Sequence, residues 1–366
     1  MTEHAATPTK SSRRPEAFGP ELVRRYGFVL GLVALVIFVQ SQNSGFLTEA
    51  NLFNIGAQYS DIIVLAVGMT FVLIAGGFDL SVGAIYAFSA VLSGTIGAHH
   101  AGSVGMLAAI GLGAGVGLIN GLAVTKLKIN PFITTLATAQ VVRGFAYLYS
   151  HNSSVTPNDP FLENLGSGRL GDVPIPLIVA TAAAVFGGVA LAFSVFGRRI
   201  YAIGGNDEAS FLSGIRTDRA RTITYVISGT AAGLAGAMYV GRVGSAQASV
   251  GELIEFDVIA ACLIGGISIS GGEGAVWRAV AGVALLAVLQ NYFNTQSIND
   301  SWVMITKGFI ILIAVALDQL TRGGRWQAMR AAISRSFSHH RRPAHPPDGG
   351  PVPGVDDEVV EARAGG

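Results

Sequence analysis

The sequence predicts an all-α membrane protein, a polytopic helix bundle of about ten transmembrane helices with both termini in the cytoplasm. Of its 366 residues, 51% are apolar and only 13% are charged, against roughly 25% charged in a typical soluble domain. The 48 glycines point the same way, because small residues let helices pack closely in lipid. Long uncharged stretches recur along the chain, and a hydrocarbon core about 30 Å thick requires roughly 20 such residues per helix.

The predicted spans are these apolar stretches, bounded by polar or turn residues. They lie near 26–40, 57–75, 81–98, 104–125, 132–150, 175–196, 222–240, 253–270, 275–291 and 302–320. The first, third and ninth are short for a full crossing, which leaves their ends open. The first follows a basic leader, as a signal-peptide core does, but no small-x-small cleavage pattern comes after it, so we expect it to be retained. Glycines spaced four apart in the fourth span predict an interhelical packing seam at Gly111, Gly115, Gly117 and Gly121.

Basic residues predict the orientation of the bundle, because cytoplasmic loops retain Lys and Arg. With the N-terminus inside, all but four of the 24 fall on the inner side. The exceptions are Arg169 and Arg242 in outer loops, and Arg143 and Lys307 within spans. We therefore expect a disordered cytoplasmic N-terminal tail at 1–22, a transmembrane domain at 23–321 and a disordered cytoplasmic C-terminal tail at 322–366.

Several chemistries are absent from the sequence. A P-loop ends in Gly-Lys, but none of the lysines follows a glycine, so ATP hydrolysis would have to come from another polypeptide; the lysines are Lys10, Lys126, Lys128 and Lys307. The single cysteine, Cys262, supports neither a disulfide framework nor a thiolate metal site. The formal net charge of +1 gives no reason to expect a nucleic-acid partner. We expect the chain itself to bind no cofactor and no metal.

A glycine-rich break, GGFDLSVG at 76–83, separates two apolar helices. Glycine lets the chain turn sharply, and Asp79 or Ser81 can accept hydrogen bonds from the first N–H groups of the following helix. One interpretation is a plain N-cap. The other is a wall of a solute path, because non-helical backbone at membrane depth persists only where protein buries it or where it lines a wet cavity.

A second break, GGISISGG at 265–272, resembles the first and suggests two related halves. Another echo pairs Arg143-Gly144-Phe145 with Lys307-Gly308-Phe309. If the chain contained two related halves, the glycine-rich breaks would place equivalent helices six spans apart, whereas the Arg143 and Lys307 motifs would place them five spans apart. The two offsets disagree, so internal duplication stays a hypothesis. Arg143 lies near the middle of the fifth span, where a cation is costly. Two roles are expected for Arg143. Either it takes part in gating or solute binding, or it is held by a structural partner such as a carbonyl group at a helix end.

The cytoplasmic loop 197–221 contains a short helical pattern, with Asn206 or Asp207 as its cap and Gly214 as its stop. Its small apolar face consists of Ala209, Phe211 and Leu212. A plain linker would not need an amphipathic helix, although a solvated, arginine-rich loop beside the membrane is the simpler alternative.

These motifs together resemble the permease subunits of bacterial ATP-binding-cassette (ABC) importers of the ribose and monosaccharide type. Residues 76–83 look like the family's GG-x-DLS-x-G signature, and 197–215 is similar to its cytoplasmic coupling loop, with Glu208 and Ala209 at the family's Glu-Ala pair. Further matches follow in the family's order, over about 26–318: Asn130, Pro131, Phe132, Arg143, Gly144, Glu255, Asp257, Gly265, Gly266, Lys307 and Gly308. The chain departs from the family in one region, where the family often has Thr, Ser and Arg and this sequence has Ser268, Ser270 and Glu273.

The resemblance implies a transport subunit rather than an enzyme, which imports a monosaccharide such as ribose, xylose or a galactose-like sugar across the bacterial cytoplasmic (inner) membrane. The implied partners are a cytoplasmic ATPase that binds the ATP, a second permease copy or paralogue, an extracytoplasmic sugar-binding protein and membrane lipid. The residues expected at the translocation path or its gate are Gly76, Gly77, Asp79, Ser81, Gly83, Asn130, Pro131, Arg143, Asp257, Ser268 and Ser270. The residues expected to couple to the ATPase are Gly204, Gly205, Asn206, Asp207, Glu208, Ala209, Phe211, Leu212 and Gly214.

Two other classes of protein fit the sequence less well. An ion-gradient-driven carrier would require paired carboxylates deep in the bundle, and the spans offer few acids beyond Asp61, Asp257 and Asp318. An intramembrane enzyme would require a His with an acid, or a Ser with a plausible base, within the spans. The sequence provides neither pattern.

Overall fold

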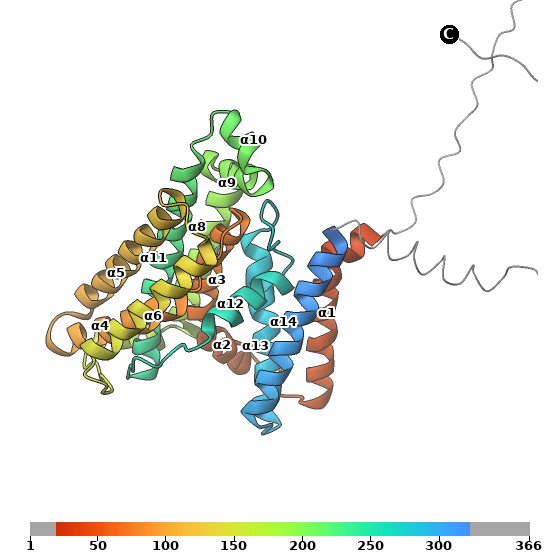
Figure 1. The fold of residues 1–366 in the computed structure, drawn as a ribbon. Coiled ribbons are helices and arrows are strands. Elements are labelled where there is room, and N and C mark those ends of the chain that lie inside the picture. Colours follow the sequence, from red (N-terminus) through yellow and green to blue (C-terminus); the bar gives the residue numbers. More distant parts are fainter. Residues whose placement is uncertain (1–19, 323–366) are drawn as a thin grey trace, which may run out of the picture. The chain divides into compact units, whose positions relative to one another are not determined.

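A computed structural model describes residues 20–322 of the chain. In this range it is helical apart from one two-stranded antiparallel hairpin (Figure 1). The elements are α1 (Pro20–Gln42), α2 (Glu49–Gln58), α3 (Ser60–Ile74), α4 (Val82–His99), α5 (Gly102–Thr125), α6 (Pro131–Tyr149), α7 (Pro160–Ser167), β1 (Arg169–Leu170), β2 (Val173–Pro174), α8 (Ile175–Phe193), α9 (Val195–Gly205), α10 (Asp207–Leu212), α11 (Thr217–Val243), α12 (Ile254–Ile264), α13 (Val276–Thr295) and α14 (Asp300–Arg322).

Two compact units divide the chain at Asp318. The first contains the helices up to that residue, and the second begins at Gln319, within the last turns of α14. The predicted tails, apart from 20–22 at the start of α1 and Arg322 at the end of α14, lie outside the described residues.

Within residues 20–322, five helices are long and apolar enough to cross a membrane: α4, α5, α8, α11 and α13. The pair α2 and α3, bent by 51° at their junction, would make a sixth span. The prediction of a polytopic helical membrane protein is therefore confirmed, whereas the number ten is not. α13 has 20 residues and is longer than the predicted ninth span.

The predicted eighth span, 253–270, is wrong as a simple crossing. Its helix α12 has 11 residues and ends at Ile264, which at 1.5 Å per residue gives roughly 16 Å, about half of a hydrocarbon core. The chain leaves the helix because Gly266 adopts the left-handed region with φ of 84°, a conformation that glycine accepts without steric cost. Hydropathy could not locate this break, since the residues beyond it remain apolar.

The centre of the first unit is α11, which packs against α3, α4, α5 and α7. Its closest neighbour is α5: a Cβ added at Gly113 or Gly117 would overlap the backbone of α11, at Gly229 and Tyr225 respectively. Small residues therefore set the distance between the two helices. The predicted seam is correct for Gly117 and Gly121 but wrong for Gly111 and Gly115, beside which a Cβ would meet nothing within 4 Å.

Candidate translocation and coupling site

The two predicted glycine-rich breaks meet in space, although almost 200 residues separate them. The N–H group of Gly272 donates a 2.8 Å hydrogen bond to the carbonyl oxygen of Ile74, the last residue of α3. A Cβ added at Gly271 would lie 2.9 Å from the Cα of Gly76 and 3.0 Å from that of Gly204. Backbone thus packs directly on backbone here, and we call the group Gly76, Gly204, Gly205, Gly271 and Gly272 the glycine junction.

Glycine is required at four of these five positions, for two reasons. Gly76, Gly271 and Gly272 have φ of 75°, 83° and 74°, in the region that other residues adopt only with strain. Gly204 has ordinary φ, but a Cβ there would overlap the carbonyl oxygen of Ile74 and lie 2.4 Å from the nitrogen of Gly272. The end of α9 is therefore in direct contact with both glycine-rich breaks.

Asp79 lies within the first break and is completely buried. Its Oδ1 atom accepts hydrogen bonds from the Ser81 hydroxyl at 2.6 Å and the Ser81 N–H at 3.1 Å. The Ser81 hydroxyl in turn accepts one from the Asn120 amide of α5 at 2.8 Å. Ser81 occupies the N-cap position of α4 but makes no side-chain capping hydrogen bond, so the N-cap interpretation is wrong for both side chains: the Asp79 carboxylate closes a turn before the helix instead.

This polar cluster extends beyond what the sequence indicated. Asn120 Oδ1 is buried without a hydrogen-bond partner among the described residues, and Ser228 of α11 lies close enough to the Asp79 carboxylate to interact with it. Tyr225 of α11 donates a 3.2 Å hydrogen bond to the Phe78 carbonyl, and its hydroxyl leaves no room for a Cβ at Gly77. Asn120 and Tyr225 were missed because isolated polar residues in apolar helices carry no local pattern.

Arg143 of α6 binds carbonyl groups, as its structural interpretation expected. One guanidinium nitrogen donates to Ala248 O at 2.8 Å and Val250 O at 2.6 Å, and the other reaches Gly251 O at 3.4 Å. The same segment packs against α4, where a Cβ on Gly83 would overlap the Glu255 carboxylate and lie 3.0 Å from Gly251 O. Arg143 and Gly83 therefore both hold the turn that precedes α12.

The remaining candidates of the path lie apart from this cluster. Asn130 is exposed and caps α6 by accepting the Phe132 N–H at 2.9 Å, with Pro131 as the first helical residue. Asp257 forms an ion pair with Lys307 of α14, with 2.9 Å between the two charged atoms. Ser268 is buried and accepts the Ser270 N–H at 3.0 Å, within the loop that leads to the glycine junction.

The predicted cytoplasmic helix is present as α10. Asn206, rather than Asp207, caps it by accepting the Ala209 N–H at 2.9 Å, and Gly214 follows it with φ of 82°. Ser210 is buried against the rest of the protein, whereas Phe211 and Leu212 are 68% and 78% exposed. The described part of the chain thus leaves Phe211 and Leu212 of α10 uncovered.

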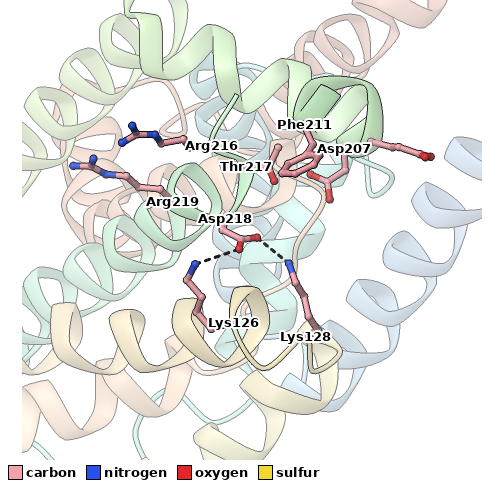
Figure 2. Close-up of a pocket in the computed structure, with 9 residues that line it drawn as sticks. Lys126, Lys128, Asp207, Phe211, Arg216, Thr217, Asp218 and Arg219 are labelled. Atoms are coloured by element: carbon pink, nitrogen blue, oxygen red, sulfur yellow. Dashed lines mark hydrogen bonds and ion pairs between the residues drawn. The ribbon is translucent and has the colours of Figure 1, made fainter. Parts of the chain in front are cut away.

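A pocket of about 610 Å³ lies between α10 and the loop that joins α5 to α6 (Figure 2). Asp218 at the start of α11 joins its two sides, through ion pairs to Lys128 at 2.9 Å and Lys126 at 3.4 Å. Phe211 and Glu208 of α10 line the pocket as well. Its wall combines one exposed aromatic ring with charges of both signs, which is typical of a protein contact surface rather than of a catalytic centre.

Together these features define a polytopic helical membrane protein with a polar, glycine-rich interior and a short helix, α10, with exposed apolar side chains. The chain belongs to the family described as "Branched-chain amino acid transport system / permease component", which matches residues 51–315. It is 40% identical to the ribose import permease protein RbsC of Bacillus subtilis over 305 residues, 81% of this chain and 94% of that one. It is 36% identical to the L-arabinose transport system permease protein AraH of Escherichia coli over 293 residues, 80% and 88% of the two chains. No solved structure gives a significant match.

Proposed function

We propose that this chain is the permease subunit of an ABC importer that carries a monosaccharide across the bacterial cytoplasmic membrane, with both termini inside. The observation that carries the proposal is α10, whose Phe211 and Leu212 are exposed in a chain similar along most of its length to ribose and L-arabinose permeases. Exposed apolar side chains rimmed by charges mark surfaces that bind protein. The partner proposed for this surface is a separate ATPase subunit, which would bind the ATP.

The glycine junction supplies a route for the coupling. α10 follows α9, and the end of α9 packs at Gly204 on the ends of both membrane breaks. Because closely packed backbone has few voids to absorb a displacement, movement of α10 is passed to the segments around Asp79 and Ser268. An ATPase can shift the permease between two states only through contacts that differ between them, and α10 provides such contacts.

The other proposed partners follow from the same assignment. A second permease subunit would complete the path, and an extracytoplasmic sugar-binding protein would deliver the solute. An ion-gradient-driven carrier is not supported, because the relatives are import permeases and the spans' acids Asp61 and Asp257 are held by Arg242 and Lys307.

Accessibility labelling tests the orientation on which the proposal depends. The native cysteine, Cys262, is buried, so Phe211→Cys and Leu170→Cys introduce exposed thiols on α10 and on the β1–β2 hairpin. A membrane-impermeant maleimide should label Leu170→Cys in intact cells and Phe211→Cys only in inverted vesicles. Labelling of Phe211→Cys from outside would overturn the coupling assignment.

Transport assays test the substrate class. Cells that express the chain together with the ATPase and binding protein encoded beside it should take up radiolabelled ribose or L-arabinose, and uptake should stop when the ATPase is omitted. Uptake of a branched-chain amino acid in place of any sugar would contradict the proposal.

A further inference from the structure

A second pocket lies at the opposite end of α11 from α10. It has a volume of about 280 Å³ and is lined by α2, α3, α4, α11, α12, α13 and the loop before α12. Three tyrosines, Tyr59, Tyr86 and Tyr239, lie in its wall. Both pockets include a residue of α11: Asp218 lines the pocket beside α10, and Arg242 lines this second pocket. The two residues are 24 positions apart, which corresponds to roughly 36 Å of helix at 1.5 Å per residue. That distance is about a membrane thickness, which agrees with the predicted placement of Arg242 on the outer side.

The charged groups of this pocket form one fixed pair. Asp61 is 1% exposed, and its Oδ2 atom accepts both Arg242 Nη2 at 2.7 Å and the Tyr86 hydroxyl at 2.8 Å, while Oδ1 accepts the Ile62 N–H at 3.0 Å. Each carboxylate oxygen therefore has a partner. A buried carboxylate in a membrane bundle is tolerated when it is paired in this way.

Arg242 still has donors to offer a ligand. A guanidinium carries five N–H donors, its ion pair with Asp61 uses one nitrogen, and the side chain is 25% exposed at the pocket. The guanidinium carbon also lies 5.6 Å from the centre of the Tyr239 ring. That ring packs edge-on against Tyr86 at 5.4 Å, so both groups are held in place before any ligand arrives.

The composition of the pocket indicates what it binds. Asp61 and Arg242 are the only charged residues in its lining and they neutralise each other, so a neutral ligand is favoured over an ion. An amino-acid carboxylate would compete with Asp61 for Arg242, and its ammonium group would find no exposed carboxylate in the lining. Aromatic rings beside a few fixed polar groups suit a molecule with an apolar face and several hydroxyl groups.

The size of the pocket agrees with this chemistry. At roughly 30 Å³ per water molecule, 280 Å³ holds about nine waters, close to the number of non-hydrogen atoms in one pentose. Pockets for larger, drug-sized ligands begin at about 300 Å³. The pocket therefore has room for a single sugar ring.

We propose that this pocket is a sugar subsite of the permease itself, in which the hydroxyl oxygens of a neutral monosaccharide accept hydrogen bonds from Arg242 and its ring stacks on Tyr239 before it crosses the bundle. The inference rests on the proposed import function and adds a binding site within the membrane chain. None of the residues expected at the translocation path from the sequence lies in this lining.

Saturation-transfer NMR on the purified full-length chain in nanodiscs tests the subsite, with ribose, L-arabinose and L-leucine as probes. A sugar signal is expected and none for L-leucine. Tyr239→Ala should weaken sugar binding by about tenfold, and Tyr239→Phe, which keeps the ring, by much less. Tyr149→Ala removes a tyrosine that lies outside the pocket and should bind the sugar as the original chain does.

The outcomes separate the subsite from the import function. Sugar binding that is equal in Tyr239→Ala and Tyr149→Ala, or that is absent from a chain that supports sugar uptake in cells, overturns the subsite and leaves the function standing. A signal for L-leucine in place of the sugars overturns both. If Tyr239→Ala lowers the amount of folded protein, Arg242→Lys supplies the second variant: it keeps the charge opposite Asp61, and weaker sugar binding is expected because the planar fork of donors is lost.

Discussion

Gly204 of α9 lies against the carbonyl oxygen of Ile74, the residue with which α3 ends. The same oxygen accepts the N–H group of Gly272 at 2.8 Å, so three segments distant in the sequence share one point of contact. The helix α9 and the two glycine-rich breaks can move independently of one another only if this contact opens. In the proposed coupling, the junction is the place where a force on α10 would reach the interior of the bundle.

Gly204→Ala should impair uptake and lower the melting temperature, because its Cβ would overlap the Ile74 carbonyl oxygen. Overpacking of this kind costs about 1–3 kcal/mol. Gly205→Ala is the matched control, since a Cβ at Gly205 meets nothing within 4 Å. Uptake per unit of inserted protein and thermal unfolding in detergent measure the effect. Equal behaviour of the two variants would show that the close contact is not needed.

Gly113→Ala should destabilise the protein by about 1–3 kcal/mol, because a Cβ there overlaps the Gly229 backbone of α11. Gly115 lies two residues further along α5, and a Cβ there has open space around it. Gly115→Ala should therefore be neutral or stabilise the helix by about 0.5–1 kcal/mol. Denaturant unfolding of the two variants compares them. If Gly115→Ala is the more damaging, α5 presents a different face to α11.

Phe211→Ala should abolish most sugar uptake and most ATPase association while the protein inserts normally. Its side chain is 68% exposed, so its removal costs little folding energy, whereas a contact with the ATPase would lose its apolar anchor. Phe186→Ala is the control, because Phe186 is 79% exposed on the predicted span α8. Co-purification of the ATPase with each variant gives the comparison, and equal recovery would contradict the coupling role.

Asp159 should make the outer segment around α7 sensitive to acid. Desolvation would raise the pKa of Asp159, but N–H donors from Gly102, Leu162 and Phe161 outweigh it and hold the pKa below its ordinary value of 3.8. A carboxylate with a lower pKa in the folded state stabilises it above the ordinary pKa, and this contribution is lost as pH falls through the folded value.

Hydrogen exchange of the amides of Gly102 and Leu162 measures this effect. Their protection should be constant from neutral pH to about pH 4 and should fall below that, after correction for the intrinsic pH dependence of exchange. Asp159→Asn should show weaker protection throughout, by roughly the 0.5–2 kcal/mol of a cap, and no such fall. A parallel fall in both proteins would assign the acid sensitivity to another group.

Features that depend on nearby residues were predictable. The helix α10, its start near Asn206 and its stop at Gly214 follow from side chains within a few residues of the backbone groups they satisfy. The break at 76–83 was predictable for the same reason, whereas the partners of Asp79 within it were not. Asn120 reaches this cluster from α5, and only the packing of α5 against α4 brings it there.

The number and completeness of the spans could not be predicted from hydropathy alone. Residues 253–270 are apolar enough to suggest a crossing, yet α12 ends at Ile264 because the following backbone turns at glycine and packs against Gly76 and Gly204. Apolar composition measures the preference for a dry environment, and the interior of a protein satisfies that preference as well as lipid does.

The sequence by itself determined the class of protein, the polar breaks and the short helix α10, because these arise from composition and from interactions between residues close along the chain. Only the tertiary structure decided that Gly76, Gly204 and Gly271 meet, and that Arg242 pairs with Asp61 across 181 positions. The physical reason is that such contacts depend on which helix faces pack together. A helix that is apolar on every side has no hydrophobic periodicity to show which face packs against its neighbour.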